Sequence, residues 1–185
     1  MKKSFMVILT LIPVILYGQK TIFVPDTTVS GIKLQDPVSL TSKIPNIKAL
    51  IDESGPGGQA FILNRDSSEI LILTFHAGTS WDRVAEFHIS ANKNGTHYRK
   101  SVKLNIDRFV TESNIKLKMT KNDLIKIKGR NYNLKKGSDN EIIKYEIDDY
   151  LTSKFLGRYN YPEYYEIYTF NKDQLIKIEF GFQYP

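Results

Sequence analysis

The chain has 185 residues, of which 41% are hydrophobic and none is cysteine, and its formal net charge is +6 at pH 7. Without cysteine there is no disulfide framework and no thiol chemistry, so stability must come from a hydrophobic core, which a chain of this length can bury. Lysine and acidic residues are interleaved along the chain. This argues against a nucleic-acid partner, because nucleic-acid binding requires basic residues gathered on one face.

The first residues, 1–18, have the three-part pattern of a secretory signal peptide. Lys2 and Lys3 form a positive start, residues 5–16 are almost wholly apolar, and Gly18 supplies a small residue for cleavage. An apolar run of about a dozen residues is short of the ~20 that span a bilayer. Lipid attachment would need a cysteine. We therefore expect an exported protein, periplasmic or extracellular, with no stable membrane anchor after cleavage.

A similar stretch of sequence occurs twice, as IKLQDPVSL from Ile32 and as IKLKMTKNDL from Ile115. Repeats at a fixed distance indicate a duplicated structural unit. In the first copy, Asp36 is a candidate helix N-cap and Pro37 occupies the first helical position, so a helix of about two turns is expected. Its apolar contacts are expected at Val38, Leu40 and Ile44.

The second copy predicts another short helix. Thr120 is a candidate N-cap, and Asp123 follows three residues later in an arrangement similar to a capping box. Gly129 stands where a C-terminal cap belongs. The apolar stripe of this helix is expected at Met119, Leu124 and Ile127.

Each helix is followed by runs with the composition and alternation of β-strands. In the first half these runs cover residues 69–75, 83–89 and 98–106, with a turn at Asn94-Gly95; in the second half they cover 141–150, 164–170 and 174–182. We therefore predict an α+β fold of two related units, 19–110 and 111–185. Each unit would be a short helix followed by an antiparallel meander with one buried and one wet face.

The stretch 115–129 and the closing hairpin 165–182 resemble a bacterial export family. The family is shared by the small accessory lipoprotein of the outer-membrane barrel-assembly machinery and by the β-lactamase inhibitory proteins. The matching positions are Met119, Thr120, Leu124, Gly129, Tyr168, Phe170, Leu175 and Ile178. The resemblance implies two tandem copies over about 29–182 and a role in binding proteins without catalysis. The missing lipid-attachment cysteine argues against the membrane-tethered assembly role.

Aromatic residues concentrate in the stretch 155–170, and they supply the candidate partner-binding site. Tyr159 and Tyr161 are expected in a loop beside Arg158, and Tyr164 begins the next strand, while Trp81 occupies the corresponding turn of the first half. Tyrosine, tryptophan and arginine are enriched at protein interfaces. The alternative is that these tyrosines simply suit a half-exposed sheet.

Other chemistry finds little support. The three histidines are His76, His88 and His97, and Glu86 shares a predicted strand face with the second of them. A zinc site needs at least three ligands in tetrahedral reach, so no metal is expected. No G-x-S-x-G elbow occurs, and GPGG at 55–58 lacks the Lys-Ser/Thr of a phosphate-binding loop. No catalytic residue and no cofactor is predicted.

The sequence thus predicts an exported, non-enzymatic protein-binding module, either an inhibitor of a secreted hydrolase or an envelope accessory protein. The alternative is a small secreted carbohydrate-active hydrolase or carbohydrate-binding protein that uses tyrosines for stacking and acidic residues for catalysis. That alternative requires convergent carboxylates in a deep pocket. A purely structural envelope protein is a third possibility. The identity of the partner and the oligomeric state stay open.

Overall fold

A computed structural model describes residues 23–53, 57–78, 81–92 and 100–183. The predicted signal peptide and the Asn94-Gly95 turn lie outside these residues. The strands are β1 (Thr28–Val29), β2 (Ile32–Lys33), β3 (Gly58–Leu63), β4 (Glu69–Phe75), β5 (Glu86–Ala91), β6 (Ser101–Lys103), β7 (Asn133–Lys136), β8 (Asn140–Ile147), β9 (Tyr164–Asn171) and β10 (Gln174–Phe182). The helices are α1 (Pro37–Lys43), α2 (Ile47–Leu50), α3 (Lys121–Lys128) and α4 (Lys154–Tyr159).

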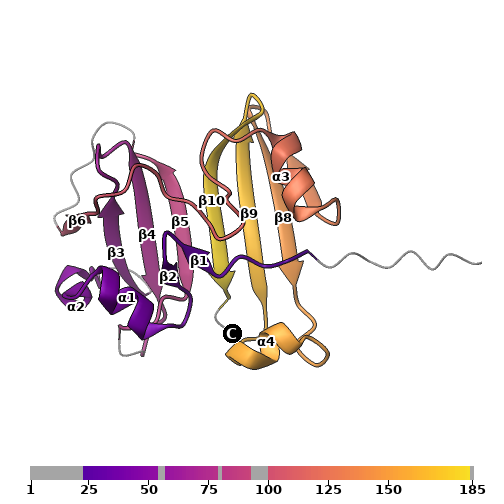
Figure 1. The fold of residues 1–185 in the computed structure, drawn as a ribbon. Helices are drawn as coiled ribbons and strands as arrows, with labels where there is room; N and C mark the ends of the chain where they lie inside the picture. The colour runs from indigo at the N-terminus through magenta and orange to yellow at the C-terminus, as the bar shows by residue number, and fades with distance from the viewer. Residues whose placement is uncertain (1–22, 54–56, 79–80, 93–99, 184–185) are drawn as a thin grey trace, which may run out of the picture.

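One eight-stranded sheet forms the body of the protein, in the order β6-β3-β4-β5-β10-β9-β8-β7, and β1 and β2 make a separate two-stranded ribbon. The four helices pack on one face of the sheet, where their apolar residues join a single core with the inward side chains of the strands (Figure 1). Representative core members are Leu40, Ile47, Leu124, Leu156 and Phe180. The opposite face carries no helix in the described part of the chain.

The predicted fold class is wrong, because the protein is mostly β and does not consist of two helix-plus-antiparallel-meander units. The run predicted over 98–106 was expected to pair with the preceding strand, yet β6 pairs parallel with β3 at the edge of the sheet. The partners of β5 are β4 and β10. Alternation identifies the buried face of a strand, but it does not identify the neighbouring strand, and the strands β3 and β7 were missed.

The repeated sequence nevertheless produces the same local structure twice. The Asp36 carboxylate accepts a hydrogen bond from the Val38 N–H at 3.0 Å, and the Thr120 hydroxyl accepts one from the Asp123 N–H at 3.2 Å, so both predicted caps are confirmed. Gln35 and Lys118 occupy the same position in the two copies, one residue before Asp36 and two residues before Thr120, and both have positive φ (59° and 69°). The repeat therefore specifies a turn and a helix start and not a whole unit.

The two predicted apolar helix faces are only partly confirmed. Leu40 and Leu124 are fully buried, whereas Val38 is 76% exposed and Ile127 is 44% exposed. Helices of seven and eight residues bury one narrow stripe each, and these two side chains lie outside it.

The three strands predicted in the second half are confirmed, with one correction to the last. Strict alternation along the strand would put Leu175 on the opposite face from Ile178 and Phe180, yet all three are buried in the core. A β-bulge between Leu175 and Lys177 shifts the register and returns Leu175 to the core face.

The strands β5 and β10 form the seam between the two halves of the sheet, and their backbones approach closely at Gly181. Gly181 pairs with Glu86. A Cβ atom added at Gly181 would lie 2.3 Å from the carbonyl oxygen of Ala85 and 2.6 Å from Cα of Glu86. Backbone atoms cannot swing aside as a side chain can, so this position excludes any residue with a side chain unless the seam opens.

Gly181→Ala is therefore expected to lower the free energy of unfolding by about 1–3 kcal/mol, through overpacking at the seam. Urea denaturation followed by circular dichroism measures the change. The matched control is Gly157→Ala in α4, where an added Cβ meets nothing within 4 Å. Because alanine favours a helix over glycine, this control should be neutral or slightly stabilising. Equal stability of the Gly181 variant and the wild type would contradict the tight seam.

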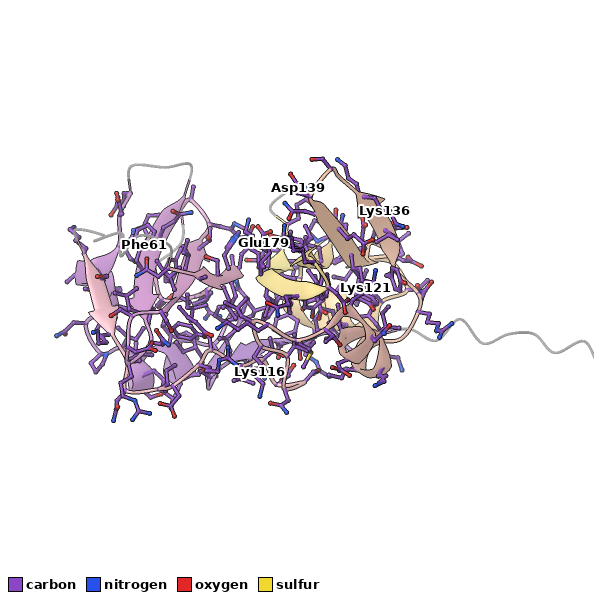
Figure 2. The ribbon with its side chains drawn as sticks, turned by 90° about the horizontal axis from the view of Figure 1, so that it is seen from above. Phe61, Lys116, Lys121, Lys136, Asp139 and Glu179 are labelled. Atoms are coloured by element: carbon purple, nitrogen blue, oxygen red, sulfur yellow. The ribbon has the colours of Figure 1, made fainter. Side chains whose placement is uncertain are left out.

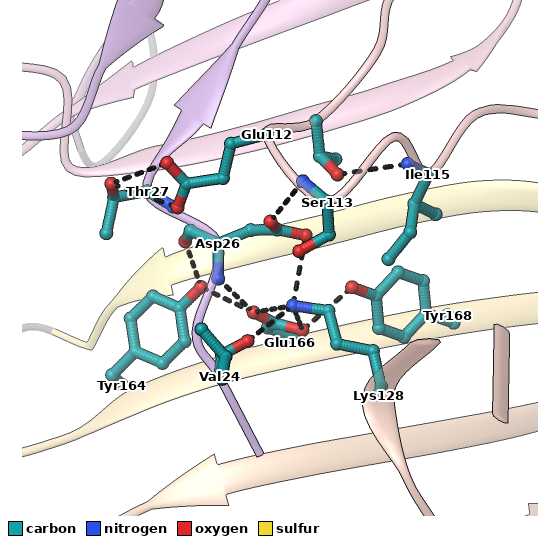
Figure 3. A network of polar contacts seen from close by, with 11 residues as sticks. Val24, Asp26, Thr27, Glu112, Ser113, Ile115, Lys128, Tyr164, Glu166 and Tyr168 are labelled. Atoms are coloured by element: carbon teal, nitrogen blue, oxygen red, sulfur yellow. Dashed lines mark hydrogen bonds and ion pairs between the residues drawn. The ribbon is translucent and has the colours of Figure 1, made fainter. Parts of the chain in front are cut away.

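A buried ionic network fastens the N-terminal segment across the second half of the sheet (Figure 3). The Lys128 ammonium lies 3.0 Å from Oδ2 of Asp26 and 2.9 Å from Oε2 of Glu166, and the side chains of Lys128 and Asp26 are 1% and 0% exposed. The hydroxyls of Tyr164 and Tyr168 donate to the Glu166 carboxylate at 2.9 and 2.7 Å. The network thus joins the N-terminal segment, α3 and β9.

Burial raises the pKa of Glu166 above its usual value, and the charge of Asp26 adds to this effect while Lys128 opposes it. The group is closed to solvent on all sides. This geometry serves the fold, because a buried carboxylate is stable only when it is paired and hydrogen-bonded.

Candidate protein-binding face

The helix-free side of the sheet presents a surface that we call the open face. Its side chains alternate with the core residues along each strand and are half-buried, as the regular alternation in β3 and β9 shows. Figure 2 shows Phe61 and Glu179 on this side and Lys116 toward the opposite side. The members used below are Phe61, Ile72, Glu86, His88, Lys144, Tyr165, Ile167, Lys177 and Glu179.

One row of these residues crosses six neighbouring strands without a break. Each is the direct cross-strand partner of the next, in the order Phe61, Ile72, His88, Glu179, Ile167 and Lys144. At roughly 4.8 Å between strands, the row is about 24 Å long. The charged pair of His88 and Glu179 lies at its centre, flanked by Phe61 and Ile72 on one side and by Ile167 on the other, and Lys144 ends the row.

The centre of the row is His88, held between two carboxylates. Its Nδ1 lies 3.1 Å from Oε1 of Glu179, and its Nε2 lies 3.3 Å from Oε2 of Glu86. Desolvation alone would lower the pKa of His88, but the hydrogen bonds and charges of Glu179 and Glu86 outweigh it and raise the pKa to about 9. The imidazole is therefore a cation at neutral pH, with both nitrogens donating.

The other charges on the open face are paired as well. The Lys177 ammonium lies 2.9 Å from Oε1 of Glu179, and the Lys144 ammonium lies 2.8 Å from Oε2 of Glu146. Burial and the neighbouring Glu86 raise the pKa of Tyr165, so its hydroxyl stays protonated at all ordinary pH values. On the open face, each of these cations is therefore ion-paired with a carboxylate, and the pairs lie between aliphatic and aromatic side chains.

The arrangement does not suit acid–base catalysis of glycoside hydrolysis. Burial opposes ionisation of Glu179, but hydrogen bonds from His88 and Lys177 prevail and lower its pKa. A catalytic acid needs the opposite, a carboxyl group that stays protonated near neutral pH.

The three histidines are not brought together among the described residues. His76 is buried directly after the end of β4, and this desolvation lowers its pKa. The centre of its ring lies 5.6 Å from that of the Tyr161 ring. His97 lies outside the described residues. No group of three potential metal ligands occurs within the described ranges.

The residues predicted to bind a partner lie near the end of the sheet where β3 and β9 begin. Most of them pack against neighbouring aromatic rings and are not free to contact a partner. Tyr159 and Tyr161 each lie 4.7 Å from the Phe182 ring, and Tyr159 belongs to α4 and not to a loop. Tyr164 is fully buried, so its prediction as a partner contact is wrong. Its hydroxyl belongs to the ionic network instead.

The two remaining candidates behave differently from each other. Trp81 is half-buried over Gly58, and its ring meets Phe75 edge-on at 6.3 Å. Arg158 is exposed on α4. These five residues therefore do not form one continuous exposed surface.

The open face was missed because its members come from six strands whose order was not predictable. Each strand did show the signal, an alternation of apolar and polar residues with a few apolar side chains on the wet side, such as Ile72 and Ile167. Without the pairing of β5 with β10, however, His88 and Glu179, 91 residues apart, could not be placed together.

Comparisons with protein-family models, with curated proteins and with solved structures found no match, so the family resemblance stays a prediction. Within the described residues, no helix has the length and apolar character to cross a bilayer.

Proposed function

We propose that the chain is an exported, non-enzymatic protein-binding module that holds a folded protein partner on the open face. The observation that supports this is a sheet of eight strands covered by helices on one side only. The uncovered side presents half-exposed apolar residues between ion-paired charges. Exposed contiguous surfaces of this kind mark interaction sites in soluble domains.

The size and composition of the open face suit a protein partner. Strands of about six residues extend for roughly 20 Å, and with a width of ~24 Å the face covers about 500 Å² before its rim is counted. A standard interface covers ~800 Å² per partner. Phe61 and Tyr165 are aromatic candidates for anchor residues.

The paired charges support recognition in a second way. His88 and Lys144 are held by carboxylates before any partner arrives, so little side-chain entropy is lost on binding. Because each charge has a partner already, the face presents fixed dipoles and not a net field. A partner would be selected by matching this pattern.

Ile72→Asp and Ile167→Asp place a charge on the open face and are expected to weaken capture of the partner at least 10-fold each, since a buried unpaired charge opposes association. Capture from an envelope or secreted fraction, with bound proteins identified by mass spectrometry, measures this. The matched control is Val38→Asp, at a 76% exposed position on the helix side.

A partner that is retained by both open-face variants, or lost equally with Val38→Asp, would contradict the proposal. Ile167→Thr keeps a β-branched residue in the strand and tests the same surface if the aspartate variants do not fold. If the captured protein is a hydrolase, stoichiometric loss of its activity on adding this chain separates an inhibitor from an accessory protein.

A further inference from the structure

A cleft of about 780 Å³ opens where the two halves of the sheet separate, near the starts of β4 and β10 and the end of β5. The last pair between β5 and β10 is Ser90 with Lys177, and the β-bulge just beyond it turns β10 away from β5. β-bulges commonly re-aim strands beside functional sites. The apolar part of the lining consists of Ile70, Ala91, Leu117, Leu175 and Ile176.

Arg108 enters this cleft with its guanidinium already oriented. The Glu69 side chain is 6% exposed, and its carboxylate accepts the Nε–H of Arg108 at 3.2 Å and the backbone N–H of Phe109 at 2.9 Å. The two terminal nitrogens of Arg108 form no hydrogen bond with any described residue. A guanidinium fixed through Nε presents these two nitrogens as a fork for a planar anion.

Lys118 supplies a second cation from the same connecting segment. It is exposed, and its backbone N–H donates to the Leu175 carbonyl at 2.8 Å, which ties it to β10. Its φ of 69° is unusual for a residue other than glycine, asparagine or aspartate. Its ammonium forms no ion pair within the described part of the chain.

The acidic side chains that line the cleft form ion pairs or hydrogen bonds with neighbouring residues of the protein. Asp107 pairs with Arg65, and Oδ1 of Asp66 accepts hydrogen bonds from the N–H and the hydroxyl of Ser68 at 3.0 and 2.7 Å. Lys177, the third cation, is paired with Glu179. The donors left for a ligand are therefore the two terminal nitrogens of Arg108, whose Nε is paired with Glu69, and the ammonium of Lys118.

We propose that this cleft binds a carboxylate carried on a compact apolar body, such as the C-terminal residues of a peptide or a free aliphatic acid. The carboxylate lies between Arg108 and Lys118, and the apolar body lies against Leu117, Leu175 and Ile176. The volume is in the range of small-ligand sites, and paired nitrogen donors are a common way to hold a terminal carboxylate. This site borders the open face, with which it shares Lys177, but Arg108, Lys118 and the apolar lining residues belong to the cleft alone.

The test uses the purified protein with N-acetyl-trileucine, its C-terminal amide and decanoate as probes in isothermal titration calorimetry. The amide is expected to bind at least 10-fold more weakly than the free acid, because it cannot form the charge-assisted hydrogen bonds. Tighter binding of the peptide or of decanoate identifies the source of the carboxylate.

Lys118→Gly should weaken binding of the free acid about 10-fold. Glycine relieves the positive φ, so this variant should be at least as stable as the wild type, and lost binding cannot be ascribed to unfolding. Arg108→Lys keeps the charge beside Glu69 but removes the fork, and about 3- to 10-fold weaker binding is expected. The control is Lys116→Gln, which removes one positive charge outside the cleft.

Equal binding of acid and amide, unchanged binding by Lys118→Gly, or no binding of either acid at ~10 mM would overturn the proposal. Ile167→Asp, which disturbs the open face, is expected to leave carboxylate binding unchanged. The two proposals therefore succeed or fail separately.

Discussion

Lys128→Met is expected to lower the free energy of unfolding by about 3–5 kcal/mol at pH 7. The substitution keeps most of the side-chain volume but leaves the Asp26 and Glu166 carboxylates buried without their cation, 3.0 and 2.9 Å from where it stood. Tyr164, Tyr168 and the backbone N–H of Asp26 still donate to Glu166, so part of its stabilisation persists. Urea denaturation measures the loss.

The loss should depend on pH in a defined direction. Without Lys128, the pKa of Glu166 in the folded state rises further above its unfolded value. A carboxyl group with a raised folded-state pKa contributes stability below its unfolded pKa, and this stability is lost as the pH rises through the folded-state value. The variant should therefore recover part of its stability as the pH is lowered from 7.

Two variants control this prediction. Lys126→Met removes an exposed lysine from the same helix, and it should change stability little. Lys128→Met combined with Glu166→Gln removes the uncompensated charge and should be more stable than Lys128→Met alone. If all three variants unfold at the same urea concentration, the network does not fasten the N-terminal segment as we describe.

The free energy of unfolding is expected to fall by about 2–3 kcal/mol as the pH rises from 6.5 to 9, because His88 loses its proton in the folded protein. The pKa of His88 is raised from 6.5 to about 9. A histidine whose pKa is raised on folding stabilises the folded state fully at pH values below its unfolded-state pKa. This stabilisation is lost as the pH rises through its folded-state pKa. Deprotonation removes a cation from between Glu86 and Glu179, while Tyr165 stays protonated and uncharged.

His88→Gln should flatten this pH dependence and lower stability at pH 6.5, since glutamine cannot supply the positive charge. His76→Gln is the matched control, because burial lowers the pKa of His76 and its titration lies below this pH range. A ¹H–¹⁵N NMR titration of the imidazole gives the pKa directly. A measured His88 pKa near 6.5 would contradict the ion pairs of His88 with Glu86 and Glu179, whatever the pH dependence of stability.

Local structure was largely predictable from the sequence, and its physical reasons are local as well. Asp36 and Thr120 cap helices by hydrogen bonds that span two or three residues, and the strands of the second half follow from alternation. The predicted strands 164–170 and 174–182 are also neighbours in the sheet, as β9 and β10.

Strand order and the open face could not be predicted in the same way. Nothing in the run 98–106 distinguishes an antiparallel neighbour of β5 from a parallel neighbour of β3, since both bury the same side chains. The tyrosines of the stretch 155–170 showed a similar ambiguity. The hydroxyls of Tyr164 and Tyr168 donate hydrogen bonds to a buried carboxylate. A composition rich in tyrosine does not distinguish such buried tyrosines from tyrosines on a binding surface.

The central place of β10 also has a consequence for the order of events during biogenesis. β5 finds its second neighbour only in residues 174–182, so a nascent chain that lacks them exposes one long unsatisfied backbone edge in mid-sheet. Contacts between segments this far apart form slowly, because a large loop must close first. The polypeptide should accordingly stay unfolded until it is nearly complete, and chains truncated before β10 should aggregate instead of folding.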